Sequence, residues 1–255
     1  MRIHIKSRKS KKSGITPFLS VIIPAYNEEE RIAQTLIRID QYLSFKKYAY
    51  EIIIVDDGSS DNTVALVSKL SRKVEHISVL KNKKNRGKGF AVRTGMRKAQ
   101  GRIRLFMDAD NSVDISHLDE FIRHLESGFD IVIGSIKIGE QRATERNGIH
   151  RRILGSLANF LIRALATPKI KDTQRGFKLF SARAAKKIFS RQTINRFGFD
   201  IELLVIARKN GYRIKEIPVV WDNPAGSKVG LSSYVFTLVE LLRIAANRAV
   251  GKYNF

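Results

Sequence analysis

The chain has 255 residues, 43% hydrophobic and 28% charged, which predicts a folded domain with one substantial core and excludes a disordered or fibrous protein. It contains no cysteine, which excludes disulfides and thiolate metal sites and favours a reducing compartment such as the cytoplasm. The net charge of +23 predicts attraction to nucleic acid, anionic lipid or phosphorylated substrates.

Residues 1–17 are expected to form a basic N-terminal tail. Its first twelve residues contain no acidic residue, and no apolar stretch follows the charges, so a signal peptide is excluded. The tail could be either a solvated arm or a tether to a membrane surface, and the sequence does not decide between the two. The cationic residues of this tail are Arg2, Lys6, Arg8, Lys9, Lys11 and Lys12.

Short apolar runs alternate with helical patterns in the first half of the chain. This order predicts an α/β fold with a mainly parallel sheet, helices on both faces, and ligands at the carboxyl ends of the strands. The expected strands are Phe18–Pro24, Glu51–Val55, His76–Leu80 and Ile103–Met107. The expected helices run from Asn27 to about Leu43, from about Asn62 to Leu70, and onward from the glycine-rich loop Asn85–Gly89.

The second half continues with two further strands and several helices. The strands are expected at Phe129–Ile133 and Ile214–Val220, and the helices near 115–127, 151–166, 181–189 and 199–210. A catalytic domain over 18–232 would then precede an amphipathic helix over 233–255, packed on the domain or on a membrane surface. The sequence contains no run of about 18 uncharged apolar residues, so we expect no transmembrane helix.

Asp108 and Asp110 directly follow one of the expected strands. Two residues apart at a strand end, both carboxylates can project to one side and share a divalent cation, for which Mg²⁺ or Mn²⁺ suits the hard oxygen ligands. A turn rich in Asp and Asn is the alternative. The position at the edge of a sheet favours the metal, because two like carboxylates there repel each other without a cation or a basic partner.

Two other polar segments also follow expected strands. In Asp56-Asp57-Gly58-Ser59 a carboxylate could accept hydrogen bonds from a base or a ribose, or the segment could be a turn. In the loop that contains Gly87 and Gly89, Lys88 could contact a phosphate, although this loop is not a Walker motif.

Several other functions are excluded by missing motifs. The five histidines lack metal-ligand spacing, and no Ser, His and Asp set indicates an acyl-enzyme. A nucleic-acid-binding module is suggested by charge alone, because no helix-turn-helix, zinc-finger or base-stacking motif is present. We therefore expect no nucleic-acid partner.

Several ordered motifs carry a resemblance to a known family. They are PAYNEEERI (24–32), IIIVDDGSSDNT (52–63), NRGKGFAVRTGM (85–96) and DADNS (108–112), and together they resemble the family 2 glycosyltransferases of the glycosyltransferase A fold. DTQRGFKLF (172–180), FGFDIELLVIARKNGYRIKEIPVVW (197–221) and GSK (226–228) resemble the dolichyl-phosphate β-glucosyltransferases and, more distantly, the dolichyl-phosphate mannose synthases. The resemblance covers roughly residues 18 to 245.

The resemblance implies roles for individual residues. A metal, Mg²⁺ or Mn²⁺, and the donor diphosphate would bind at Asp108 and Asp110, while Arg151 and Lys228 would contact phosphate groups. Arg152 adjoins Arg151, and the sequence leaves open which of the two faces the site. The nucleotide-sugar site implied by the resemblance consists of Pro24, Tyr26, Glu28, Val55, Asp57, Lys88, Asp108, Ala109 and Asp110.

Three departures weaken the similarity to the mannose synthases. Ser112 stands where those enzymes have a metal-binding glutamine, and Asp222 and Ile136 stand where they have arginines. The implied reaction is therefore transfer of a hexose, expected to be glucose from UDP-glucose, to a polyprenyl or dolichyl phosphate, with inversion. GDP-mannose as the donor and a glycan as the acceptor, with Asp172 as the base, are the alternatives.

The implied location is the cytoplasmic face of a membrane. The eukaryotic glucosyltransferases have a membrane-spanning N-terminal segment, for which this sequence shows no counterpart. Peripheral attachment to the membrane surface, or a separate membrane protein as partner, is expected in its place.

Overall fold

The computed structural model of the chain describes residues 16–74, 76–138, 170–222 and 231–255, with side chains given for 236 and from 238 onward in the last range. Most of the basic tail and the helix expected at 151–166 lie outside the described residues. So do Arg151, Arg152 and Lys228, and their roles stay predictions.

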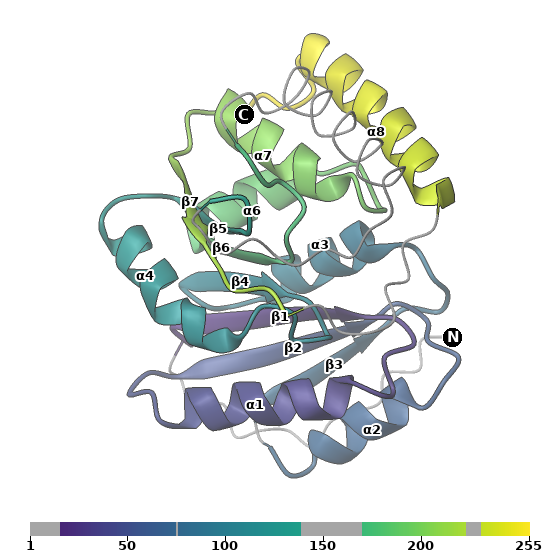
Figure 1. Cartoon of the computed structure of the whole chain (residues 1–255), viewed down its shortest axis with the longest axis vertical. Helices are drawn as coiled ribbons and strands as arrows, with labels where there is room; N and C mark the ends of the chain where they lie inside the picture. Colours follow the sequence, from purple (N-terminus) through teal and green to yellow (C-terminus); the bar gives the residue numbers. More distant parts are fainter. Residues whose placement is uncertain (1–15, 75, 139–169, 223–230) are drawn as a thin grey trace.

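A seven-stranded mixed sheet with the order β3-β2-β1-β4-β6-β5-β7 forms the centre of the described structure (Figure 1). All strands run parallel except β6, which pairs antiparallel with both β4 and β5. The strands are β1 (Leu19–Ala25), β2 (Tyr50–Asp56), β3 (Ile77–Lys81), β4 (Ile103–Met107), β5 (Ile131–Ser135), β6 (Phe177–Ser181) and β7 (Ile214–Pro218).

Helices cover both faces of this sheet (Figure 1). Helices α1, α2 and α4 contribute to one apolar cluster, and α3, α6 and α7 contribute to the other, with α8 packed on the outside of α7. Their bounds are α1 (Ile32–Ser44), α2 (Thr63–Leu70), α3 (Lys88–Lys98), the 3-10 helix η1 (Ile115–His117), α4 (Leu118–Glu126), α6 (Ala182–Arg191), α7 (Phe199–Lys209) and α8 (Leu231–Ala249).

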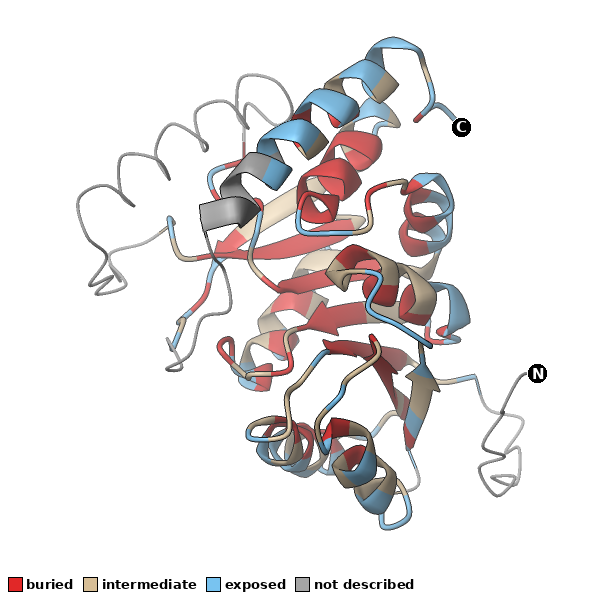
Figure 2. Cartoon of the chain, turned by 90° about the vertical axis from the view of Figure 1, so that its right-hand side faces the viewer, coloured by how far each residue is buried: buried red, intermediate tan, exposed pale blue. Residues whose placement is uncertain are grey.

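Apolar side chains of the strands and inner helix faces are buried, while outer helix faces are exposed (Figure 2). Helix α7 is buried along almost its whole length, so it is a core element. Its polar residue Glu202 is fully buried, but it accepts hydrogen bonds from the backbone of Thr193 and Ile194 and from the Tyr253 hydroxyl. A buried carboxylate with this many donors is compatible with a stable core.

The expected fold class is confirmed, and the expected strands of the first half match within one or two residues. One strand was missed, because the sequence of β6 places Lys178 in the strand interior, where it is fully buried. The helix near 115–127 is divided into η1 and α4.

The expected start of the first helix was wrong. Helix α1 begins at Ile32, because Asn27 has a left-handed φ of 54° and the backbone N–H groups of Glu28 and Glu29 donate to Thr63 and Asp61 instead of starting a helix. The acidic residues therefore lie in a loop that contacts the second β-α unit.

The strand order reverses between β1 and β4. From β1 the chain proceeds to β2 and β3 on one side and returns to β4 on the other side, so the order reverses at this pair. Ligands of open α/β sheets bind at such a reversal, outside the carboxyl ends of the strands. The loop after β1 and the turn that begins at Asp108 follow the two strands at which the order reverses.

Candidate active site

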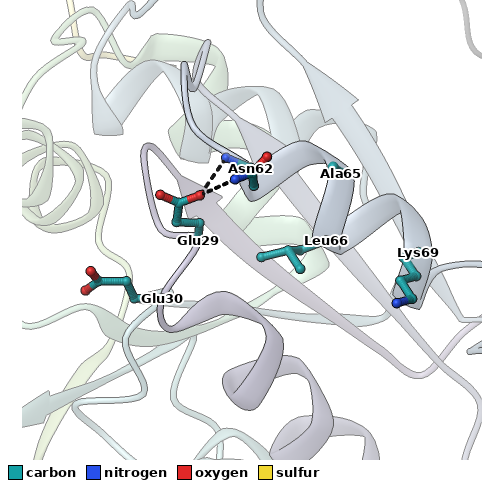
Figure 3. A pocket seen from close by; sticks show the side chains of 6 residues that line it. All are labelled: Glu29, Glu30, Asn62, Ala65, Leu66 and Lys69. Atoms are coloured by element: carbon teal, nitrogen blue, oxygen red, sulfur yellow. Dashed lines mark hydrogen bonds between the residues drawn. The ribbon is translucent and has the colours of Figure 1, made fainter.

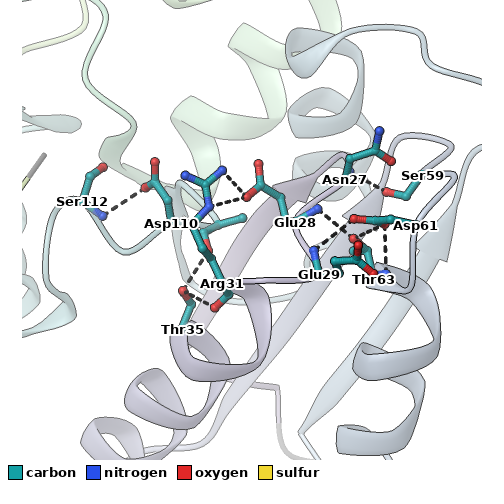
Figure 4. A network of polar contacts seen from close by, with 11 residues as sticks. Asn27, Glu28, Glu29, Arg31, Thr35, Ser59, Asp61, Thr63, Asp110 and Ser112 are labelled. Carbon is teal, nitrogen blue, oxygen red and sulfur yellow. Dashed lines mark hydrogen bonds and ion pairs between the residues drawn. The ribbon is translucent and has the colours of Figure 1, made fainter. Parts of the chain in front are cut away.

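The turn after β4 is fixed from three sides. The Asp108 backbone N–H donates to the Gly176 carbonyl at 3.1 Å, and the Thr35 hydroxyl of α1 donates to the Ala109 carbonyl at 2.7 Å. The Asp110 carboxylate accepts a hydrogen bond from the Ser112 backbone N–H at 3.0 Å (Figure 4). The two acidic side chains are therefore presented by a well-anchored backbone.

Lys88, the first residue of α3, faces this turn. Its Nζ lies 2.6 Å from Asp108 Oδ1, and both side chains are about one quarter exposed. Burial disfavours the ammonium, but the charge of Asp108, helped by Asp200 and Asp110, outweighs it and raises the pKa of Lys88. The N-terminal end of α3 adds positive potential at the same place. A basic partner therefore offsets the repulsion between the two carboxylates.

Gly176 forms a wall beside Asp108. A Cβ added to Gly176 would lie 2.1 Å from Asp108 Oδ2, which is far inside van der Waals contact. A larger residue here would force the Asp108 carboxylate to move, so glycine permits the direction that this carboxylate takes.

A second ion pair lies buried behind the first. Lys178 is fully buried, and its Nζ donates to Asp200 Oδ1 and to the Arg175 carbonyl, both at 2.6 Å. Burial raises the pKa of Asp200, and the charges of Lys178 and Lys88 act in the opposite direction. Two acids and two lysines from four segments thus interact under the carboxyl edge of the sheet.

Asp57, after β2, organises the loop that leads to Lys88. Its buried carboxylate accepts hydrogen bonds from the backbone N–H groups of Arg86 and Gly87 and from the Asn82 side chain. Contact of Asp57 with a base or ribose stays a prediction. The neighbouring Asp56 accepts from the backbone of Gly58 and Ser59 and so forms the expected turn.

The loop after β1 contains the exposed Tyr26 and the partly buried Glu28. The Glu28 carboxylate pairs with Arg31 at 2.6 Å, and its backbone N–H donates to Thr63 (Figure 4). Pro24 and Val55 face each other across the parallel pair β1–β2, where both are buried, so they form the floor beneath this loop.

Asp172 is held by groups of the chain itself. Its carboxylate accepts from the Ile136 backbone N–H at 3.3 Å and pairs with Arg175 at 2.9 Å, and the residue is 4% exposed. These contacts favour a structural role over that of a base for a sugar hydroxyl. The backbone of Asp222 is bonded to the Ser112 carbonyl at 2.9 Å, which joins the segment after β7 to the acidic turn.

The donor set at the turn fits a divalent cation that takes part of its ligands from a substrate. Within the ranges that the structure describes, no three Asp, Glu or His side chains form a cluster that could hold a metal. Asp108 and Asp110 therefore supply two carboxylates, and hard cations of this type complete their shells with water and phosphate oxygens.

A separate hollow of about 450 Å³ lies at the start of α2 (Figure 3). It shares none of its lining with the acidic turn, and the Glu29 carboxylate at its rim is bonded to Asn62. We assign no ligand to it. The lining residues are Glu29, Glu30, Asn62, Ala65, Leu66 and Lys69.

Sequence reasoning did not find the roles of Gly176, Lys178 and Asp200. All three lie in the motifs 172–180 and 197–221, but no spacing within one segment indicates that Lys178 pairs with Asp200 or that Gly176 contacts Asp108. The one signal in the sequence was Lys178 within the apolar run 177–180, because a lysine in such a run needs an acidic partner elsewhere in the fold.

An acidic turn and a helix-terminal lysine at the reversal point of a mainly parallel sheet are typical of α/β proteins that bind phosphorylated ligands. A family model described as Glycosyl transferase family 2 matches residues 20–189. The chain belongs to this family and is a glycosyltransferase.

Proteins named dolichyl-phosphate beta-glucosyltransferase are among its relatives. One from Trichomonas vaginalis is 37% identical, with 89% of this chain and 73% of the relative covered. Those from Drosophila melanogaster and Homo sapiens are 39% and 35% identical, with 83% and 84% of this chain and 69% and 70% of the relatives covered. The resemblance in the sequence motifs is therefore confirmed.

Solved structures share the fold. Glucosyl-3-phosphoglycerate synthase from Mycobacterium tuberculosis, in complex with UDP, has a TM-score of 0.67 at 20% identity, covering 90% of this chain and 80% of that one. A mannosyltransferase from Pyrobaculum calidifontis, in complex with GDP-Man and Mn²⁺, has a TM-score of 0.60 at 21% identity, covering 92% and 65%. The fold is therefore the glycosyltransferase A fold.

Proposed function

We propose that this enzyme transfers glucose from UDP-glucose to a polyprenyl phosphate, such as dolichyl phosphate, with inversion at the anomeric carbon. The observation that carries the proposal is the acidic turn at the β1–β4 reversal, with Lys88 paired to Asp108. The names of the relatives support the acceptor and the sugar, and the UDP complex of a structural neighbour supports the nucleotide.

The donor nucleotide would lie over the loop after β1. Tyr26 is 41% exposed and offers a ring for a base, while the buried Pro24 and Val55 support the loop from below. Asp57 would contribute by holding the loop at Arg86 and Gly87 in place. Glu28 and Ala109 would complete this wall of the site.

The diphosphate would lie at the acidic turn. A Mg²⁺ or Mn²⁺ ion held by Asp108 and Asp110 would stabilise the negative charge that develops on the leaving nucleoside diphosphate. Lys88 and the N-terminal end of α3 offer positive charge and N–H donors to the same phosphates.

The acceptor needs no dedicated base. A phosphate monoester has a second pKa of about 6, so at neutral pH it is already an anionic nucleophile. Arg151 and Lys228 would position phosphate groups. Lys228 follows β7 in the sequence, and the described end of that segment is anchored at the site, because the Asp222 backbone is bonded to Ser112 of the acidic turn.

A membrane surface would supply the lipid acceptor, and we place the enzyme peripherally on its cytoplasmic face. No described helix is sufficiently long and apolar to cross a bilayer. Helix α8 exposes Phe236, Val239 and Leu242 while it buries Leu241 and Ile244 against the domain. Such an apolar stripe on a protein of net charge +23 suits binding to anionic lipid, with or without a membrane protein partner.

Asp110→Asn tests the site directly. The variant should fold normally and lose metal-dependent glucose transfer by at least about a hundredfold, because one of two protein ligands is lost. Asp119→Asn is the matched control, since it removes the same charge from a carboxylate that pairs with Lys46 on the surface. Near-normal transfer by Asp110→Asn would remove Asp110 from the metal site.

A further inference from the structure

The Lys88 ammonium forms an ion pair with the Asp108 carboxylate, which the proposed function assigns to the metal. The contact of 2.6 Å between Lys88 Nζ and Asp108 Oδ1 leaves little room for a cation on that oxygen. Within the described ranges, the Asp110 carboxylate accepts a hydrogen bond from the Ser112 N–H and from no other donor. One of the two expected metal ligands is thus already neutralised by the protein itself.

The backbone around Lys88 is fixed, so only its side chain is free to move. A Cβ on Gly87 would lie 2.4 Å from the Asn195 carbonyl oxygen, and one on Gly89 would lie 2.6 Å from Phe199. The backbone therefore lies close against Asn195 and Phe199, and the N–H groups of Gly87 and Phe90 hold it by donating to Asp57 and to the Asn195 carbonyl. The ammonium can leave Asp108 by rotation of its four-carbon side chain without disturbing the fold.

From this arrangement, and resting on the proposed function, we propose that Lys88 is a displaceable counter-ion that couples cation binding to nucleotide diphosphate binding. Without a donor, the ammonium competes with a divalent cation for Asp108, so the cation binds weakly. A diphosphate offers the ammonium new oxygen partners and gives the cation additional ligands, so both events favour each other.

The buried pair behind Lys88 keeps the ammonium in the site during this exchange. Asp200 interacts electrostatically with both Lys88 and Asp108, and it is itself fixed by Lys178 at 2.6 Å. When a cation takes Asp108, the negative charge of Asp200 still attracts the ammonium toward the cleft. Lys178 and Asp200 are therefore positioning residues.

Mn²⁺ binding, measured by the loss of the free-ion electron paramagnetic resonance signal, tests the proposal without turnover. Coupled sites commonly change each other's affinity by about 5- to 150-fold. Lys88→Met should bind Mn²⁺ about tenfold more tightly than the wild type in the absence of nucleotide. The further gain in Mn²⁺ affinity on adding UDP should shrink by about the same factor.

Two variants serve as matched controls. Lys83→Met removes an exposed charge from the same loop and should leave Mn²⁺ affinity unchanged, while Lys88→Arg keeps the charge and should retain weak binding. If a thermal melt shows that Lys88→Met is not folded, Lys88→Gln is used in its place.

The outcomes separate the inference from the proposed function. If nucleotide-free Lys88→Met binds Mn²⁺ no more tightly than the wild type, while the wild type binds Mn²⁺ with UDP, the counter-ion role is overturned and the metal site stands. If neither the wild type nor any of the variants binds Mn²⁺, even with UDP present, both the metal site and the inference are wrong.

Discussion

Lys178 and Asp200 show how single buried residues stabilise the site from behind. Removal of one partner of a buried ion pair leaves an uncompensated charge, which costs about 3–5 kcal/mol. We therefore expect Lys178→Met to lower the free energy of unfolding by this amount in urea denaturation. Adding Asp200→Leu should restore most of it, because the second charge is then removed as well.

The exposed pair of Arg183 and Asp130 is the matched control for this experiment. The Arg183 side chain is 76% exposed, so Arg183→Met should lower the free energy of unfolding far less than Lys178→Met does. If the losses of Lys178→Met and Asp200→Leu simply add in the double variant, the two residues do not act as a pair.

The sequence around Asp108 and Asp110 predicted the acidic turn, but it did not predict which residues contact that turn in the fold. Asp108 and Asp110 were predictable, because a strand end followed by two acids is a local pattern. Lys178 belongs to a strand that the sequence did not indicate, and Gly176 directly precedes that strand. The partners of both residues lie far away along the chain. The use of Asp57 by its own loop likewise depends on tertiary contacts.

At the scale of elements, the loop after β1 and the start of α2 are held together by Asp61. Burial opposes the charge of Asp61, but hydrogen bonds from Thr63 and from the Glu29 backbone outweigh it and lower its pKa. Since the folded pKa lies below the unfolded value, the stabilisation is present at neutral pH and is lost as pH falls through the folded pKa.

Asp61→Asn should therefore lower the free energy of unfolding by about 1 kcal/mol at neutral pH. The difference from the wild type should shrink as the pH falls through the folded pKa, which lies below the ordinary aspartate value, because Asp61 is then protonated. Urea denaturation at a series of pH values measures it. A difference that does not change with pH would show that the charge of Asp61 contributes nothing.

Element order was predictable because apolar runs and helical patterns alternate clearly from Leu19 to Met107. The beginning of α1 was not, because hydrogen bonds to Asp61 and Thr63 override the local preference of acidic residues for a first helical turn. Tertiary contacts of this kind leave no local pattern, whereas β6 was missed because Lys178 stands in its interior.

At the scale of the whole molecule, the exposed face of α8 predicts membrane binding. Each large apolar side chain buried in the interface contributes about 1.5–3 kcal/mol. Val239→Glu with Leu242→Glu should weaken binding to anionic phospholipid vesicles by at least about tenfold in a sedimentation assay, with an unchanged melting temperature. Phe45→Glu is the control, because Phe45 is 87% exposed at the end of α1. Equal binding by all three proteins would remove α8 from the membrane contact.

The central claim is glucose transfer to a lipid phosphate at the acidic turn, and a phase-partition assay tests it most directly. The protein is incubated with Mn²⁺, dolichyl phosphate in vesicles, and either radiolabelled UDP-glucose or radiolabelled GDP-mannose, and the organic phase is counted. We predict that label enters the organic phase from UDP-glucose and not from GDP-mannose. Label that enters from GDP-mannose alone, or that stays entirely in water-soluble products, would contradict the proposed function.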